Sequence, residues 1–160
     1  MQEISFTTKA KAYEWAELSA QDRALVEAAK QMTNHSYSPY SHFRVGAAAQ
    51  LQNGVIIKGA NQENAAYPSG LCAERVTLFA ANANYPKEKV EALAIACNAD
   101  GHFTTDPGAP CGACRQVMLE TEHRYSGDMR VLLYGEKYTL VFNSAKDLMP
   151  LGFFAEDLLG

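Results

Sequence analysis

The chain has 160 residues, of which 48% are hydrophobic and 20% are charged, and its formal net charge at pH 7 is −4. This length suits one domain with a buried core, so we expect residues 1–160 to form a single domain. The acidic balance gives no electrostatic reason to expect nucleic acid or an anionic membrane as a partner. No apolar run approaches membrane-spanning length, and the first residues lack the pattern of a secretory signal. We therefore expect a cytoplasmic protein whose thiols stay reduced.

The first predicted element is a helix over residues 19–32. Ser19 and Asp22 have the spacing of a capping box at its start. One face of this segment is apolar, which is typical of a helix that packs on a core. The residues on that face are Leu25, Ala28, Ala29 and Met32.

Two strands are predicted next, over residues 44–51 and 55–60. Asn53 and Gly54 lie between them and favour a tight hairpin turn. The turn-rich segment "NHSYSPYSHF" that precedes the first of these strands is expected to be a loop.

Helices and strands alternate in the rest of the chain. Residues 72–84 are predicted to form a helix with Val76, Phe79 and Ala80 on its buried side. Residues 90–99 are almost continuously apolar, which indicates a strand buried on both faces.

A third helix is predicted over residues 111–124, followed by strands over 129–135 and 137–142 and a short tail over 145–158. Strand–helix–strand alternation implies right-handed crossovers with helices packed on a largely buried sheet. We therefore predict a three-layer α/β/α fold with a mixed sheet of about five strands and helices on both faces. In such folds, binding sites form where helix N-termini gather at strand ends.

The four cysteines divide into two groups. Cys97 lies within the apolar run "ALAIAC", where a free cysteine behaves as a small hydrophobe. Cys72, Cys111 and Cys114 each lie at or near the start of a predicted helix. In a reducing compartment, grouped cysteines are metal ligands or catalytic groups more often than disulfides.

Cys111 and Cys114 are three residues apart on a first helical turn, so they face the same way and can hold one ion. With Cys72 they supply three ligands and leave one position open, which is typical of a catalytic zinc site. A structural zinc site remains possible if a His or Asp closes the shell, and a redox pair would leave Cys72 without a role. Glu74 lies two residues after Cys72, beside the open position, where a carboxylate can act as general acid and base.

Three thiolates bring more negative charge than one zinc ion neutralises, which weakens the action of the metal on water. Arg75 and Arg115 lie next to the cysteine motifs, and we predict that their guanidinium groups hydrogen-bond to the thiolates. The positive ends of the two helix dipoles act in the same direction.

The motifs "CAER" and "PCGACRQV" match the Cys-x-Glu and Pro-Cys-x-x-Cys pattern of zinc deaminases that act on cytosine or adenine. Together with "YSPYSHFRVGAAA" and "GANQENAAYPSGLCAER", the chain resembles the small homotetrameric cytidine deaminases of pyrimidine salvage. The resemblance covers residues 13–157. Arg44 departs from it, because the family usually has proline there.

The resemblance implies that Cys72, Cys111 and Cys114 bind one zinc ion per subunit. It also implies that Glu74 moves protons while zinc-bound hydroxide attacks C4 of the base. The expected reaction converts cytidine or 2'-deoxycytidine to the uridine product and ammonia.

The resemblance further implies a nucleoside site formed by Phe43, Asn61, Glu63 and Ala73. Asn61 and Glu63 are expected on the ribose hydroxyls. This agrees with their spacing, because residues i and i+2 of an extended segment face the same way.

The tail "PLGFFAEDL" resembles the family segment whose phenylalanine reaches a neighbouring subunit. Phe153 is the better match, although Phe154 adjoins it. The resemblance therefore implies a homotetramer with pockets shared between subunits.

Three alternatives remain at this point. A deaminase of a cytosine-nucleoside antibiotic, of the blasticidin-S type, shares the same core motifs. A polynucleotide deaminase needs a basic, aromatic-lined groove, which the acidic composition does not favour. A non-catalytic, zinc-stabilised interaction module requires a metal whose ligands all come from the protein.

Overall fold

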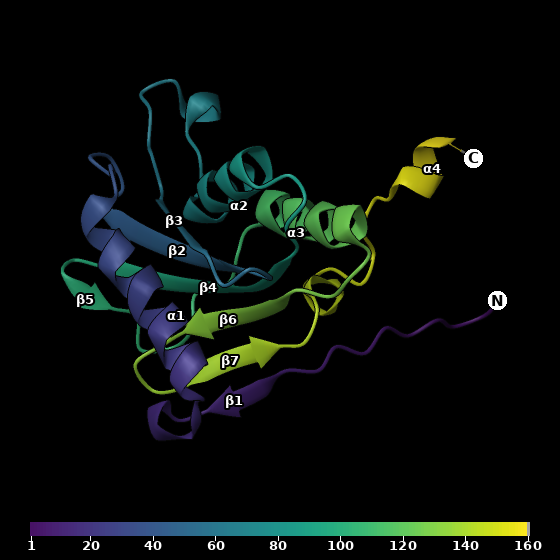
Figure 1. Cartoon of the computed structure of the whole chain (residues 1–160), viewed down its shortest axis with the longest axis horizontal. Coiled ribbons are helices and arrows are strands. Elements are labelled where there is room, and N and C mark those ends of the chain that lie inside the picture. Colours follow the sequence, from purple (N-terminus) through teal and green to yellow (C-terminus); the bar gives the residue numbers. More distant parts are fainter. Residues whose placement is uncertain (160) are drawn as a thin grey trace.

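The computed structural model of the protein describes residues 1–159 (Figure 1). It contains the predicted series of helix, two strands, helix, strand, helix and two strands. These elements are α1 (Ala20–Met32), β2 (Phe43–Leu51), β3 (Ile56–Ala60), α2 (Ala73–Asn84), β4 (Val90–Ala99), α3 (Gly112–Tyr125), β6 (Arg130–Tyr134) and β7 (Thr139–Phe142). A short helix, α4 (Ala155–Leu159), follows near the C-terminus. Across residues 1–159, no helix combines the length and the apolar character that crossing a bilayer requires.

The sheet has seven strands, two more than the predicted number of about five. Its order is β1-β7-β6-β4-β2-β3, and β5 pairs with the end of β4. Among the pairs of strands β1–β7 in the described residues, only β4–β6 is parallel, so the sheet is mixed, as predicted. The two additional strands are β1 (Lys11–Tyr13) and β5 (His102–Phe103). Each of them has three residues or fewer and no alternation of apolar and polar residues. Only the pairing of β1 with β7 and of β5 with β4 identifies them as strands.

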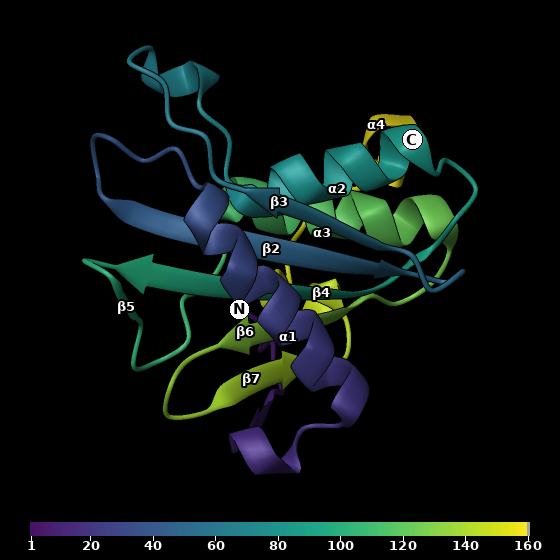
Figure 2. The ribbon, with the colours of Figure 1, turned by 60° about the vertical axis from the view of Figure 1, so that its left-hand side comes forward.

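Helices cover both faces of this sheet, which confirms the three-layer prediction. Figure 2 shows α1 crossing one face, with α2 and α3 side by side on the other. The strand β4 serves both layers: Leu93 and Ile95 join the core under α2 and α3, whereas Ala94 and Ala96 join the core under α1. Alternate strand residues point to opposite faces, which explains why β4 is apolar along nearly its whole length.

The buried side of α2 differs from the prediction. Phe79 is 46% exposed, and the side that packs on the sheet carries Glu74, Thr77 and Leu78. The close approach of α2 to β3 explains this, because a Cβ atom at Gly59 would lie 2.5 Å from Thr77 Oγ1. A small polar side chain therefore occupies the contact, and the larger Phe79 lies outside it.

Candidate metal centre and active site

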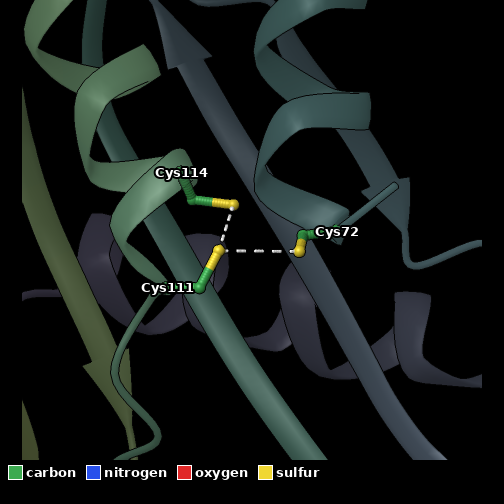
Figure 3. Close-up of side chains that lie close together, drawn as sticks. All are labelled: Cys72, Cys111 and Cys114. Atoms are coloured by element: carbon green, nitrogen blue, oxygen red, sulfur yellow. Dashed lines mark hydrogen bonds between the residues drawn. The ribbon is translucent and has the colours of Figure 1, made fainter. Parts of the chain in front are cut away.

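The three cysteines meet where α2 and α3 begin (Figure 3). Cys72 is the N-cap of α2 and Cys111 is the N-cap of α3, both with extended backbone dihedrals. Cys114 lies one turn into α3 and is fully buried. Because the two helices run side by side on one face of the sheet, their N-termini bring together thiols that are 39 residues apart in the chain.

The sulfur positions fit one zinc ion. Cys72 Sγ lies 3.9 Å from Cys111 Sγ, which lies 3.5 Å from Cys114 Sγ, and all three atoms are within 4.8 Å of one another. Ligands of a tetrahedral zinc at the usual Zn–S distance are about 3.8 Å apart. In residues 1–159 no fourth His, Cys, Asp or Glu completes this group. The described residues of this chain therefore offer three ligands and not the four of a closed structural zinc shell.

The electrostatics of the thiols favour a cation. The neighbouring Cys114 thiol, and then the hydrogen bond from Arg75, lower the pKa of Cys72 to about 5. The neighbouring Cys72 thiol, together with burial, raises the pKa of the Cys114 thiol. A bound metal displaces the remaining thiol protons, because metal ligation requires deprotonated thiols.

Glu74 is the second residue of α2 and is only 5% exposed. Burial is the main cause of its raised pKa, and the negative charge of Cys72 raises it further. A carboxyl group with a raised pKa is a better proton donor once protonated than an ordinary carboxyl group, which suits it to proton transfer.

A cavity of about 690 Å³ opens over this centre. Cys72, Cys111 and Glu74 line it, and Cys97 of β4 contributes to its wall. Burial, and then the charge of Glu74, raise the pKa of Cys97 to about 12, so Cys97 remains a neutral thiol, in keeping with the predicted small hydrophobe.

The same cavity is lined by three of the residues predicted at the nucleoside site. These are Phe43 at the start of β2 and Asn61 and Glu63 in the extended segment after β3. Ala73 is fully buried, and its carbonyl accepts a hydrogen bond of 2.8 Å from Thr77 Oγ1.

The side chain of Asn61 is largely engaged within the protein. Its Oδ1 accepts from Val45 N at 2.8 Å and from Ser36 Oγ at 2.6 Å, and its Nδ2 donates to Phe43 O at 2.9 Å. An amide nitrogen has two hydrogens, so one remains available toward the cavity. Asn61 thus anchors the start of β2 and still offers one donor.

Comparisons with known proteins agree with this geometry. The sequence profile described as "Cytidine and deoxycytidylate deaminase zinc-binding region" matches residues 19–126. The chain belongs to this family. A cytidine deaminase of Halalkalibacterium halodurans is 41% identical over 134 residues, which are 84% of this chain and 95% of the relative. A probable cytidine deaminase of Dictyostelium discoideum is 33% identical over 84% of each chain.

Solved structures show the same fold. The crystal structure of a cytidine deaminase from Burkholderia pseudomallei has a TM-score of 0.72 and 38% identity, and the match covers 85% of this chain and all of that one. The cytidine deaminase from Mycobacterium tuberculosis has a TM-score of 0.66 and 32% identity, with 85% and 99% coverage. In this member of the family, zinc is the metal of the site, and Cys72, Cys111 and Cys114 bind it.

The two arginines beside the family's cysteine motifs have different partners. Arg75 Nη2 donates to Cys72 Sγ at 3.6 Å, as predicted. Arg115 donates from Nε to Pro110 O at 2.8 Å and from Nη1 to Leu148 O at 3.1 Å. The prediction that Arg115 hydrogen-bonds to a thiolate is therefore wrong. Its bonds tie the loop before Cys111 to the segment that leads to the tail.

Gln116, which the sequence interpretation did not single out, holds the tail against α3. Its Nε2 donates to Phe153 O at 2.6 Å, and Phe153 N donates to its Oε1 at 3.1 Å. Phe154 packs on the core under α3, whereas the Phe153 ring is 54% exposed and does not line the cavity of its own chain. The position of Gln116 directly after Arg115 in "PCGACRQV" is the only signal for its role that the sequence offered.

Proposed function

We propose that this protein catalyses the hydrolytic deamination of cytidine and 2'-deoxycytidine to uridine or deoxyuridine and ammonia. One observation supports this most: a buried carboxyl group and two thiols of the three-cysteine cluster line the same cavity as Asn61 and Glu63. The relatives reported above are named cytidine deaminases.

Zinc held by three thiolates supplies Lewis acidity, which makes water a nucleophile near neutral pH. Glu74 accepts the proton of the attacking water and delivers it to N3 of the pyrimidine, which makes C4 electrophilic. It then takes the second proton of that water from the oxygen added at C4 and passes it to the departing amine, so the C4 carbonyl forms as ammonia leaves and the net reaction consumes one water. The hydrogen bond from Arg75 to Cys72 withdraws charge from the thiolates and so preserves the acidity of the metal.

The remaining predicted residues bind the nucleoside. Asn61 and Glu63 bind the ribose hydroxyls, and the partly exposed Phe43 ring packs against the substrate. Ala73 is the first residue of α2, where a backbone N–H has no intrahelical acceptor, so it is a donor for the base carbonyl. The proposed substrate is a free nucleoside and not a nucleic acid, in keeping with the negative net charge of the chain.

We further propose a homotetramer of single-domain subunits in which Phe153 completes the pocket of a neighbouring subunit. The ring is exposed while Gln116 fixes its backbone, as expected for a side chain that contacts a partner. Because the metal ligands are free thiols, a reducing compartment such as the cytosol suits the protein.

The test is to mix the purified, zinc-loaded protein with cytidine and follow the ultraviolet spectrum and ammonia release together. We expect both to change in parallel, to stop after chelation, and to return when zinc is added. A parallel assay with a cytosine-nucleoside antibiotic identifies the preferred substrate. Absence of ammonia from cytidine with full zinc occupancy contradicts the proposal.

A further inference from the structure

The loop that precedes β2 carries a serine whose hydroxyl lies between two residues of the nucleoside site. Ser41 Oγ donates to Glu63 Oε1 and accepts a hydrogen bond from Phe43 N at 3.0 Å. Ser41, Phe43 and Glu63 all line the cavity over the metal centre. None of the chemistry derived above uses this serine.

The direction of the Ser41 hydroxyl follows from its partners. A hydroxyl has one hydrogen to donate and two lone pairs that accept. Phe43 N–H occupies a lone pair, which leaves the single hydrogen for the carboxylate of Glu63. The left-handed backbone of His42, with φ of 57°, bends the chain so that Phe43 N returns to the Ser41 side chain.

The other carboxylate oxygen of Glu63 is held by the same loop. Its Oε2 accepts from Tyr40 N at 2.9 Å and from Ser41 N at 3.3 Å. The pKa of Glu63 is lowered, first by the Ser41 hydroxyl and then by Tyr40 N–H, so the group is a carboxylate near neutral pH. The two backbone bonds restrain Oε2 alone, and the hydroxyl of Ser41 holds Oε1, which sets the rotation of the carboxylate.

We propose that Ser41 is a positioning residue for sugar recognition, whose hydroxyl holds the Glu63 carboxylate in the orientation that binds the ribose hydroxyls. This inference rests on the proposed function and adds a residue that governs binding of the sugar. Ser41 acts through Glu63 and not on the reacting atoms, so its loss weakens nucleoside binding and leaves the chemical step intact.

The experiment compares Ser41→Ala and Ser41→Thr with the wild-type holoenzyme on cytidine and on 2',3'-dideoxycytidine, which lacks the 2'- and 3'-hydroxyls of the sugar. We expect Ser41→Ala to raise KM for cytidine by about tenfold, the loss typical of one hydrogen bond to a charged group, with little change in kcat. KM for the dideoxynucleoside stays at its wild-type value, and Ser41→Thr restores KM for cytidine. Ser69→Ala is the matched control, because Ser69 is an exposed serine at the end of the short 3-10 helix Tyr67–Ser69 and its hydroxyl has no hydrogen bond within residues 1–159.

A double-mutant cycle tests whether Ser41 acts through Glu63. If it does, Glu63→Gln and the double variant Ser41→Ala/Glu63→Gln share one KM for cytidine, because the effects of coupled residues do not add. Ser41→Cys, which has a similar shape but is a weak donor, gives the result of Ser41→Ala without changing the loop's shape.

Three results overturn the inference: an unchanged KM for cytidine in Ser41→Ala, an equal rise in KM for both nucleosides, or additive effects in the cycle. All three are measured on an enzyme that deaminates cytidine. Failure of the wild type with cytidine instead overturns the proposed function, so the two failures are distinguishable.

Discussion

The starts of α2 and α3 resemble each other in sequence and differ in what they do. Each helix follows a cysteine N-cap with extended dihedrals, and each has an arginine within its first turns. Arg75 is three residues after Cys72, on the same helix face, and donates to its sulfur. Arg115 is four residues after the N-cap Cys111 and directly follows Cys114, yet it donates to backbone carbonyls. The acceptors that the fold brings within reach of each guanidinium group, and not sequence position, therefore decide which arginine hydrogen-bonds to a thiol.

The second positions of the two helices differ as well. In α2 this position holds Glu74, which is buried beside the cavity, whereas in α3 it holds Ala113, which is exposed. The start of α2 thus carries one metal ligand and the carboxyl group that we propose for proton transfer, and the start of α3 carries two ligands and the anchor of the tail. This contrast predicts different consequences for substitutions at the two helix starts.

The largest expected effect is on α2. Glu74→Gln keeps the shape of the side chain but cannot accept a proton, so kcat should fall by about 10²–10⁴. Zinc content measured by atomic absorption should stay at one per subunit, because Glu74 is not a ligand. Glu120→Gln, at an exposed position of α3, is the control and should retain wild-type turnover. Near-wild-type turnover of Glu74→Gln would remove Glu74 from the mechanism.

The arginines give the sharpest test of the comparison. Arg75→Ala should weaken zinc binding by about 10–100-fold in competition with a chromophoric chelator, because it removes the hydrogen bond to Cys72. Arg115→Ala should instead lower the free energy of unfolding by about 2 kcal/mol in urea titrations, because it leaves two backbone carbonyls without their donor. Equal losses of zinc affinity in the two variants would contradict the difference between the helix starts.

The two phenylalanines of the tail held by α3 allow the stability of the subunit to be tested separately from its contact with a neighbouring subunit. Phe154→Ala should lower the free energy of unfolding by about 2 kcal/mol, because Phe154 packs on the core under α3. Phe153→Ala should leave the stability of the subunit almost unchanged and raise KM for cytidine, because the exposed ring belongs to a neighbouring pocket in the proposed tetramer. Urea titrations and steady-state kinetics distinguish the two. The reverse pattern would assign the partner contact to Phe154.

The smallest effect is expected beneath both helix starts, at Cys97 of β4. Cys97→Ala removes one buried sulfur and should cost about 1 kcal/mol of stability, while zinc content stays at one per subunit. Cys97 is not part of the cluster of three thiols, and burial raises the pKa of its thiol to about 12. Loss of zinc from this variant would show that the fourth cysteine is not a simple hydrophobe.

Much of the fold was predictable from local patterns. The long apolar run of β4 and the hairpin turn at Asn53 and Gly54 have strong local causes, and both elements are present. The short strands β1 and β5 were missed because their few residues carry no pattern of their own. The buried side of α2 was misassigned because the close approach of Gly59 to Thr77 overrides hydrophobicity at that contact.

The sequence by itself determined the chemistry that is set by spacing along one helix or strand: the Cys111–Cys114 pair, Glu74 two residues after Cys72, and the i, i+2 relation of Asn61 and Glu63. Such relations depend only on helical and extended geometry, which is the same in every fold. Only the tertiary structure decided that Cys72 meets the other two thiols and that Arg115 turns away from them. It also decided that the Ser41 hydroxyl reaches Glu63. These contacts join segments far apart in the chain, so they arise from the packing of α2, α3 and the loop before β2 over a common sheet.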